Sequence, residues 1–283
     1  MSTRKLIIAS SLRNYQNEAR IAINRLATEV SGRLADMGYE VILCLTDDAS
    51  DDDTYGVLKG ALETFPGEVK LFRSNPRKFR GPAFVIGLEY ALSALTESEY
   101  HDSVIILCDL CAKAPHDPHE FPHLLRSVEF FDAREKMIVV GSTYYGGLTN
   151  DDFELQGMGA LQFYEAAKFS GISSKGEPCN IQSPGLLAAT ADLFAKAIKN
   201  YRIFDKNFEN FAKDPARPGP GTPGIILMML AIAGGGVYGH TLPVPPYGDW
   251  RPCRSWDELM PHMQGTLKYL GVIKAMFRAG LFK

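Results

Sequence analysis

The chain has 283 residues, of which 46% are hydrophobic and 22% are charged, as in an ordinary soluble globular protein. Its net charge is −3 and its sequence pI is about 6.1, so no overall positive field would hold a nucleic acid backbone. These values exclude nucleic acid as an expected partner. The five cysteines are an odd number, and Cys44 and Cys108 lie in apolar runs, so we expect reduced thiols in a cytoplasmic protein.

Apolar runs and helical patterns alternate through the first half of the chain. Strands are predicted at residues 6–10, 41–45, 69–72, 103–108 and 137–141, and helices at 18–37, 55–64, 82–95 and 120–131. This alternation predicts an α/β fold with a mostly parallel sheet flanked by helices, whose ligands bind beyond the carboxyl ends of the strands. The rhythm is less regular after residue 143, where helices are predicted at 158–169, 188–200 and 225–233.

An acidic loop, residues 46–54, follows the second predicted strand and reads Thr-Asp-Asp-Ala-Ser-Asp-Asp-Asp-Thr. Neighbouring carboxylates repel one another by roughly a kcal/mol or more per pair at partly buried sites, so stability alone does not favour this cluster. We expect a ligand to use it, either the hydrogen-bond donors of a nucleobase and ribose or a divalent cation. The alternative is a solvated turn that caps the next helix, because Ser50, Asp51 and Asp52 are good N-cap residues.

Short motifs follow one another in a definite order through the first half. They are Asn17-Glu18, Asp47-Asp48-Ala49-Ser50 with Asp52 and Thr54, Arg80-Gly81, Asp109 after the fourth strand, and Gly141-Ser142. Over about residues 4–143 this succession resembles family 2 glycosyltransferases of the GT-A fold. A weaker similarity, through residues 7–14 and 181–188, connects the chain to capsule-associated mannosyltransferases, which share the GT-A architecture.

The resemblance implies a glycosyltransferase that moves a sugar, with inversion, from a UDP- or GDP-type donor to a sugar, lipid-phosphate or small-molecule acceptor. It implies one continuous GT-A domain, with a nucleotide-sugar-binding half at 1–143 and an acceptor half with C-terminal helices at 144–283. The donor nucleotide would contact Ser11, Arg13, Glu18, Asp47, Asp48, Arg80, Asp109 and Leu110.

By the same resemblance, Asp47 or Asp48 would recognise the nucleobase imide, and Arg80 would lie against the base or the phosphates. A carboxylate accepts from an imide N–H, and a guanidinium suits a diphosphate. Arg80 could instead be a surface cation, and Glu18 could merely cap the first helix.

The chain departs from the family pattern where a D-x-D motif would bind Mg²⁺ or Mn²⁺. It has Asp109-Leu110-Cys111, and a thiol suits these hard cations poorly. Asp109 could still hold a metal, with His240 as a second candidate ligand, so metal dependence stays open. His240 could equally be a strand-end histidine without a ligand.

An inverting transfer needs a general base for the acceptor hydroxyl, and no acid precedes the helix predicted at 225–233. Glu209, Asp214 and Asp109 are the catalytic candidates, each of which could be an ordinary surface acid. An acceptor that is already an anion, such as a phosphate, would need no base.

Two further alternatives stay open from the sequence. The incomplete D-x-D motif allows a catalytically inactive GT-A protein that binds a nucleotide or a glycan. The C-terminal pattern, residues 267–283, predicts an amphipathic basic helix that could contact a membrane peripherally or pack on a partner, although packing on its own domain is the commoner arrangement.

Overall fold

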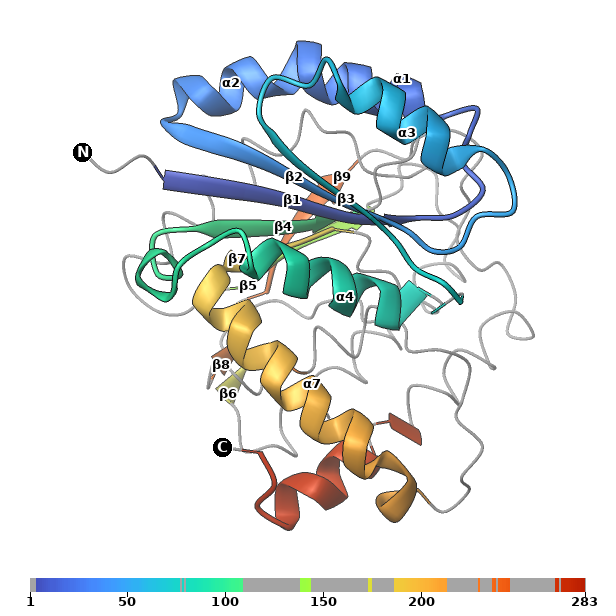
Figure 1. Ribbon diagram of the computed structural model, residues 1–283. Coiled ribbons are helices and arrows are strands. Elements are labelled where there is room, and N and C mark those ends of the chain that lie inside the picture. Colours follow the sequence, from blue (N-terminus) through green and yellow to red (C-terminus); the bar gives the residue numbers. More distant parts are fainter. Residues whose placement is uncertain are drawn as a thin grey trace, which may run out of the picture.

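The computed structural model of the protein describes residues 4–76, 78, 80–108, 138–143, 173–174, 186–212, 229, 236–237, 239–244, 268–269 and 271–282. In this part of the chain a seven-stranded sheet carries helices on both faces (Figure 1). Its strands, in spatial order, are β3 (Glu68–Arg73), β2 (Tyr39–Asp47), β1 (Arg4–Leu12), β4 (Val104–Cys108), β7 (Leu186–Thr190), β5 (Ile138–Thr143) and β9 (Gly239–Val244). Two short strands, β6 (Ser173–Ser174) and β8 (Gly236–Val237), form a separate parallel pair.

Every neighbouring pair in the large sheet is parallel except the two pairs that involve β7. The predicted fold class, an α/β fold with a mostly parallel sheet flanked by helices, is confirmed. The chain order also reverses within the sheet. From β1 the chain proceeds to β2 and β3 on one side, whereas β4 begins on the other side of β1.

Alternate residues of the central strands bury against different helices. On one face, Leu6 and Ile8 pack in a core with α1 (Ala19–Arg25), the π-helical segment η1 (Leu26–Val30), α2 (Ser31–Asp36) and α3 (Thr54–Leu62). On the other face, Ile7 and Ala9 pack in a core with α4 (Arg80–Leu92) and α7 (Ala191–Phe211). This period of two is what a strand with helices on both sides requires. The short 3₁₀ helix η2 (Glu97–Glu99) precedes β4.

The strands and helices predicted before residue 109 are confirmed in type, with ends shifted by a few residues. The helix predicted at 188–200 is partly wrong, because residues 186–190 form strand β7 and the helix begins at Ala191 and continues to Phe211. The helices predicted at 120–131 and 158–169, and at 225–233 apart from Met229, lie outside the described residues.

The C-terminal segment packs on its own domain. Residues 268–269 and 271–278 are helical, and Tyr269, Val272 and Met276 are buried in the core that also contains Phe204 and Phe208 of α7. Peripheral membrane contact through this helix stays a prediction. Among the helices that the structure describes, none combines the length and the apolar character needed to span a bilayer.

Candidate functional site

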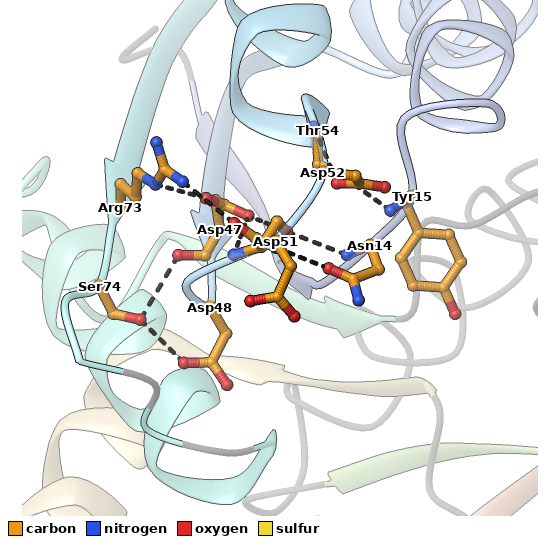
Figure 2. A network of polar contacts seen from close by, with 10 residues as sticks. Asn14, Tyr15, Asp47, Asp48, Asp51, Asp52, Thr54, Arg73 and Ser74 are labelled. Carbon is orange, nitrogen blue, oxygen red and sulfur yellow. Dashed lines mark hydrogen bonds and ion pairs between the residues drawn. The ribbon is translucent and has the colours of Figure 1, made fainter.

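Two loops meet at the carboxyl edge of the sheet (Figure 2). The β1 loop, residues 13–18, leads from β1 into α1, and the acidic loop, residues 46–54, ends β2 and leads into α3. Because the strand order reverses between β1 and β4, this edge is where an open α/β sheet binds its ligands. The two loops are therefore the described part of the candidate site.

Asp47, the last residue of β2, is fully buried and held by protein groups on both oxygens. Its Oδ1 accepts hydrogen bonds from the hydroxyl and the backbone N–H of Ser50. Its Oδ2 lies 3.1 Å from Nε of Arg73, an ion pair without hydrogen-bond geometry. Arg73 also donates from Nη2 to the carbonyl oxygen of Ser50 at 3.1 Å, and its guanidinium lies 5.4 Å from the ring centroid of Tyr55. Asp47, Ser50 and Arg73 thus form a closed group of contacts.

Asp48 is also buried, with 3% of its surface exposed, but its carboxylate points away from that of Asp47 (Figure 2). Its Oδ1 accepts from the hydroxyl of Ser74 at 2.8 Å and from the backbone N–H of Lys78 at 2.6 Å. No hydrogen bond within the described part of the chain engages Oδ2, and this oxygen is not among the enclosed polar atoms that lack a partner. Oδ2 of Asp48 is therefore the oxygen of this buried carboxylate that the described residues leave without a donor.

The carboxylates of Asp51 and Asp52 connect the acidic loop to the β1 loop. Asp51 pairs with Nη2 of Arg13 at 2.6 Å, and its backbone N–H donates to Oδ1 of Asn14 at 2.9 Å. Asp52 accepts from the backbone N–H of Gln16 at 3.3 Å and from the backbone N–H of Thr54 at 3.0 Å. Asp51 and Asp52 thus hold the acidic loop against the β1 loop, and use of the cluster by a ligand stays a prediction.

The capping alternative applies to Asp52, because its carboxylate accepts from the backbone N–H of Thr54, the first residue of α3. Burial alone would raise the pKa of Asp52, but hydrogen bonds from the hydroxyl and backbone N–H of Thr54 and from the backbone of Gln16 hold it below its usual range. Asp53, the N-cap residue of α3, makes no side-chain capping bond and is exposed.

A metal ion does not fit the described residues of this edge. Across the described ranges, no three His, Cys, Asp or Glu side chains come together as a metal site requires. Asp47 pairs with Arg73 and Asp51 with Arg13, so two of the carboxylates already have cations. Of the two expected users of the acidic loop, the hydrogen-bond donors of a nucleobase match its geometry better than a cation does.

Four other predicted donor-binding residues, Ser11, Arg13, Glu18 and Arg80, lie at the same edge. Ser11 is partly buried near the end of β1 and is in register with Thr46 of β2. Arg13 begins the β1 loop, Glu18 is the half-buried N-cap residue of α1, and Arg80 is the first residue of α4. Glu18 makes no side-chain capping bond to α1. Their contacts with a donor stay predictions.

Of the predicted catalytic and metal-binding residues, Glu209 and His240 lie in the described part of the chain. Asp109, Leu110, Cys111 and Asp214 lie outside the described residues. Glu209 is exposed in the last turn of α7, the end of the helix that lies next to the C-terminal segment in Figure 1.

His240 lies near the amino end of β9, where its backbone is in register with Val139 of β5. Val139 is in register with Ala188 of β7, and Ala188 with Ile106 of β4. His240 is therefore level with the middle of β4 and three strands away from it. This register does not favour a metal shared with Asp109, which follows β4 directly in the sequence.

Three residues of the site were not among the sequence candidates. Arg73, the last residue of β3, binds Asp47, and Ser74, the next residue, binds Asp48. Asn14 joins the β1 loop to the acidic loop. One sequence signal could have found Arg73: a cation at the end of a predicted strand, next to the strand that ends in an aspartate. Parallel register then brings Asp47 and Arg73 side by side.

Neither a protein-family model nor a curated protein matches the chain significantly. Among solved structures, the mannosyltransferase PcManGT from Pyrobaculum calidifontis in complex with GDP-Man and Mn²⁺ is 14% identical with a TM-score of 0.46, over 99% of this chain and 69% of that one. S. aureus TarS 1–349 in complex with UDP-GlcNAc is 12% identical with a TM-score of 0.45, over 96% and 66%. GalNAc-T7 with UDP, GalNAc and Mn²⁺ is 14% identical with a TM-score of 0.42, over 89% and 46%. This chain spans about two thirds of the first two and less than half of the third, and at these scores we draw no conclusion about function from them.

Proposed function

We propose that this chain is a glycosyltransferase of the GT-A fold that binds a nucleotide-diphosphate sugar at the carboxyl edge of its sheet. The observation that carries the proposal is the asymmetry of Asp48, whose Oδ1 takes two donors from the protein while no described residue donates to Oδ2. An acceptor left unpaired in a buried setting costs about 1–3 kcal/mol, so this oxygen favours a ligand that brings a donor. The imide N–H of uracil or guanine is such a donor.

Protein contacts fix which oxygen of Asp48 faces the ligand. The hydroxyl of Ser74 and the backbone N–H of Lys78 both bind Oδ1, so rotating the carboxylate would break two hydrogen bonds. Asp47 cannot take the same role without giving up Arg73 and Ser50. Of the two adjacent aspartates, Asp48 is therefore our choice for the nucleobase.

The rest of the donor has a natural place beside this contact. Helix α4 begins at Arg80, shortly after Lys78, and the free backbone N–H groups of a helix N-terminus bind phosphate well. We assign the diphosphate to this helix end, with Arg80 as its cation. Ser11, Arg13 and Glu18 line the same edge from β1 and the β1 loop.

The acceptor side of the proposal rests on the sequence alone. Asp109 and Leu110 would follow β4 at the donor, and Asp109 together with the substrate phosphates would supply oxygen ligands for Mg²⁺ or Mn²⁺. Inverting transfer would use Glu209, Asp214 or Asp109 as the base, unless the acceptor is a phosphate. His240 is the remaining candidate metal ligand.

The substitution Asp48→Asn tests the nucleobase contact directly. The amide can keep its Oδ1 on Ser74 and Lys78 and would then place Nδ2, a donor, where Oδ2 now accepts. Uracil and guanine present an N–H at this position, whereas cytosine and adenine present an acceptor nitrogen. We expect calorimetric affinity for UDP or GDP to fall about 10- to 100-fold, the value of a hydrogen bond to a charged group, while CDP or ADP gains.

Asp53→Asn is the matched control, because it makes the same chemical change in the same loop at an exposed side chain without a capping bond. Its nucleotide preference should equal that of the unchanged protein. Binding of no nucleotide diphosphate, with or without Mg²⁺ or Mn²⁺, would refute the proposal. Tight binding without sugar transfer or donor hydrolysis would instead support the catalytically inactive GT-A protein.

A further inference from the structure

Ser50 lies at the centre of the contacts between the two loops of the site. It is buried, with 5% of its surface exposed, and both hydrogen-bonding functions of its hydroxyl are used. The backbone N–H of Asn14 donates to Oγ of Ser50 at 2.9 Å, and the hydroxyl donates in turn to Oδ1 of Asp47. The carbonyl oxygen of Ser50 accepts from Arg73. One residue thus connects β1, β2 and β3 at their carboxyl ends.

The backbone on both sides of this connection adopts a conformation that is unfavourable by itself. Ala49 has φ 51° and Asn14 has φ 56°, both in the left-handed region. Asparagine tolerates this region, but alanine rarely enters it. Such a conformation persists only where neighbouring contacts impose it. The contacts of Ser50, next in the chain, are the ones that hold Ala49.

The left-handed turn at Ala49 follows both aspartates and leads directly into Ser50. Asp47 contacts Ser50 and Arg73, whereas Asp48 points the other way, toward Ser74 (Figure 2), and also accepts from the backbone N–H of Lys78. If the hydroxyl of Ser50 were absent, Oδ1 of Asp47 would lose its short contact, and the backbone N–H of Asn14 would lose its acceptor. The turn at Ala49 could then relax and shift the backbone that carries Asp48 relative to Ser74 and Lys78, whose two hydrogen bonds to Oδ1 set its orientation.

We propose that Ser50 is a positioning residue for donor recognition: its hydroxyl ties the β1 loop to Asp47 and thereby keeps Oδ2 of Asp48 directed at the nucleobase. The inference rests on the proposed function, because it names the group that gives the Asp48 contact its selectivity. The inference concerns the preference of the site for one nucleobase over another, and the loss of folding stability in a Ser50 variant is a secondary effect.

The test compares Ser50→Ala with Ser31→Ala. Ser31 is equally buried, at 5% exposed, and its hydroxyl makes one hydrogen bond, to the carbonyl oxygen of Leu26, within the helical segment η1–α2. Both variants lose a buried hydroxyl, so both should lose stability. Only Ser50→Ala should reduce the ratio of affinities for UDP over CDP, or GDP over ADP, by about ten-fold, the worth of one fixed hydrogen bond to a charged group. An unchanged ratio in Ser50→Ala would overturn the proposal.

A second readout does not depend on nucleotide. In the free protein, hydrogen exchange at the backbone N–H of Asn14 should accelerate about ten-fold in Ser50→Ala and stay unchanged in Ser31→Ala. If the unchanged protein binds no nucleotide, the proposed function fails, and the exchange rates still decide whether Ser50 holds the loops together. Equal exchange rates in both variants would overturn that role as well.

Asn14→Gly covers the case in which Ser50→Ala does not fold. Glycine accepts φ 56° without strain and keeps the backbone N–H that binds Ser50, but it removes the acceptor for the backbone N–H of Asp51. We expect faster exchange at Asp51 and a smaller drop, about two- to three-fold, in the ratio of nucleotide affinities. No change in either quantity would contradict the inference.

Discussion

Replacing Arg73 by methionine should destabilise the protein far more than replacing a comparable surface cation. The carboxylate of Asp47 is fully buried, and the nearest cationic atom is Nε of Arg73 at 3.1 Å. Removing one partner of a buried pair typically costs 3–5 kcal/mol, because the other charge is left without compensation. Methionine keeps most of the apolar stem, so the loss is mainly electrostatic.

The geometry sets the magnitude near the lower end of that range. At 3.1 Å and an effective dielectric constant of 20, the attraction is about 5 kcal/mol before any solvent screening. The side chain of Arg73 is 48% exposed, so water reaches the pair from one side and roughly halves the attraction. Asp47 also keeps its two donors from Ser50. We expect a loss of about 3 kcal/mol in the free energy of unfolding.

Equilibrium unfolding in urea, followed by circular dichroism, measures this loss. Lys70→Met is the control, because Lys70 lies on the same strand and pairs with Glu68 at 3.5 Å with both side chains partly exposed. Such a surface pair is worth at most about 1 kcal/mol. The double variant with Asp47→Asn and Arg73→Met should recover much of the stability, since no buried charge remains. Equal losses for Arg73→Met and Lys70→Met, or no recovery in the double variant, would show that the pair does not stabilise the loop.

Four further outcomes follow from the structure. Oγ1 of Thr46 is enclosed without a hydrogen-bond partner in the described part of the chain, so Thr46→Val should raise the urea midpoint by the equivalent of about 1 kcal/mol; a loss of stability would mean that the hydroxyl has a partner. Ala49→Gly should stabilise the protein by about 0.5–1 kcal/mol, because relief of the left-handed strain exceeds the entropy cost of glycine, and a decrease would argue against φ 51°. A side-chain hydrogen bond from Lys5, with further bonds from Thr96, lowers the pKa of Glu99 to about 2. The stability that the ionised Glu99 contributes is therefore present above about pH 4.5 and is lost as the pH falls toward 2, so Glu99→Gln should flatten the acid limb of a pH–stability curve. Burial raises the pKa of the Cys44 thiol to about 12, so iodoacetamide at pH 8 should label it only after unfolding, and rapid labelling of the native protein would contradict its buried position.

Local pattern was sufficient for the first half of the fold because β1, β2 and β4 are buried central strands that alternate with helices. It failed at β7. Residues 186–190 read Leu-Leu-Ala-Ala-Thr, and alanine has the highest helix propensity, so the sequence predicts a helix there. The structure inserts this segment between β4 and β5, where it pairs on both edges. Hydrogen bonding to two strands outweighs a propensity of a few tenths of a kcal/mol per residue.

The end of the following helix was misplaced for a related reason. The helix was predicted to end at Asn200, a residue type with low helix propensity, but Asn200 is buried at 4% exposure inside α7. Apolar side chains continue at the helical spacing, with Tyr201, Phe204 and Phe208 packing against Tyr269 and one another. That spacing was the better guide, because burial of an apolar face decides where a helix ends more strongly than one polar residue does.

The site divides into a part that the sequence could predict and a part that it could not. The acidic loop was recognisable, but the separate roles of its carboxylates depend on partners more than twenty residues away in the chain. Arg73 binds Asp47 through strand register, Arg13 binds Asp51 across the two loops, and Lys78 binds Asp48 through its backbone N–H. A backbone N–H donor in particular cannot be predicted from the type of amino acid, because every residue except proline has one.

The charges that remain after these pairings suggest how a nucleotide diphosphate would be oriented. Within the described residues, Arg13 and Arg73 neutralise two carboxylates of the acidic loop, while Asp48, Asp52 and Asp53 have no cation within ion-pair distance. A diphosphate placed among these three carboxylates would be repelled, whereas an uncharged base would not. The proposed orientation therefore puts the base at Asp48 and the phosphates toward the start of α4, whose N-terminus carries a positive partial charge. If this orientation holds, Asp53→Asn should strengthen the binding of nucleoside diphosphates slightly at low salt without changing the preference among bases, and added salt should remove the gain.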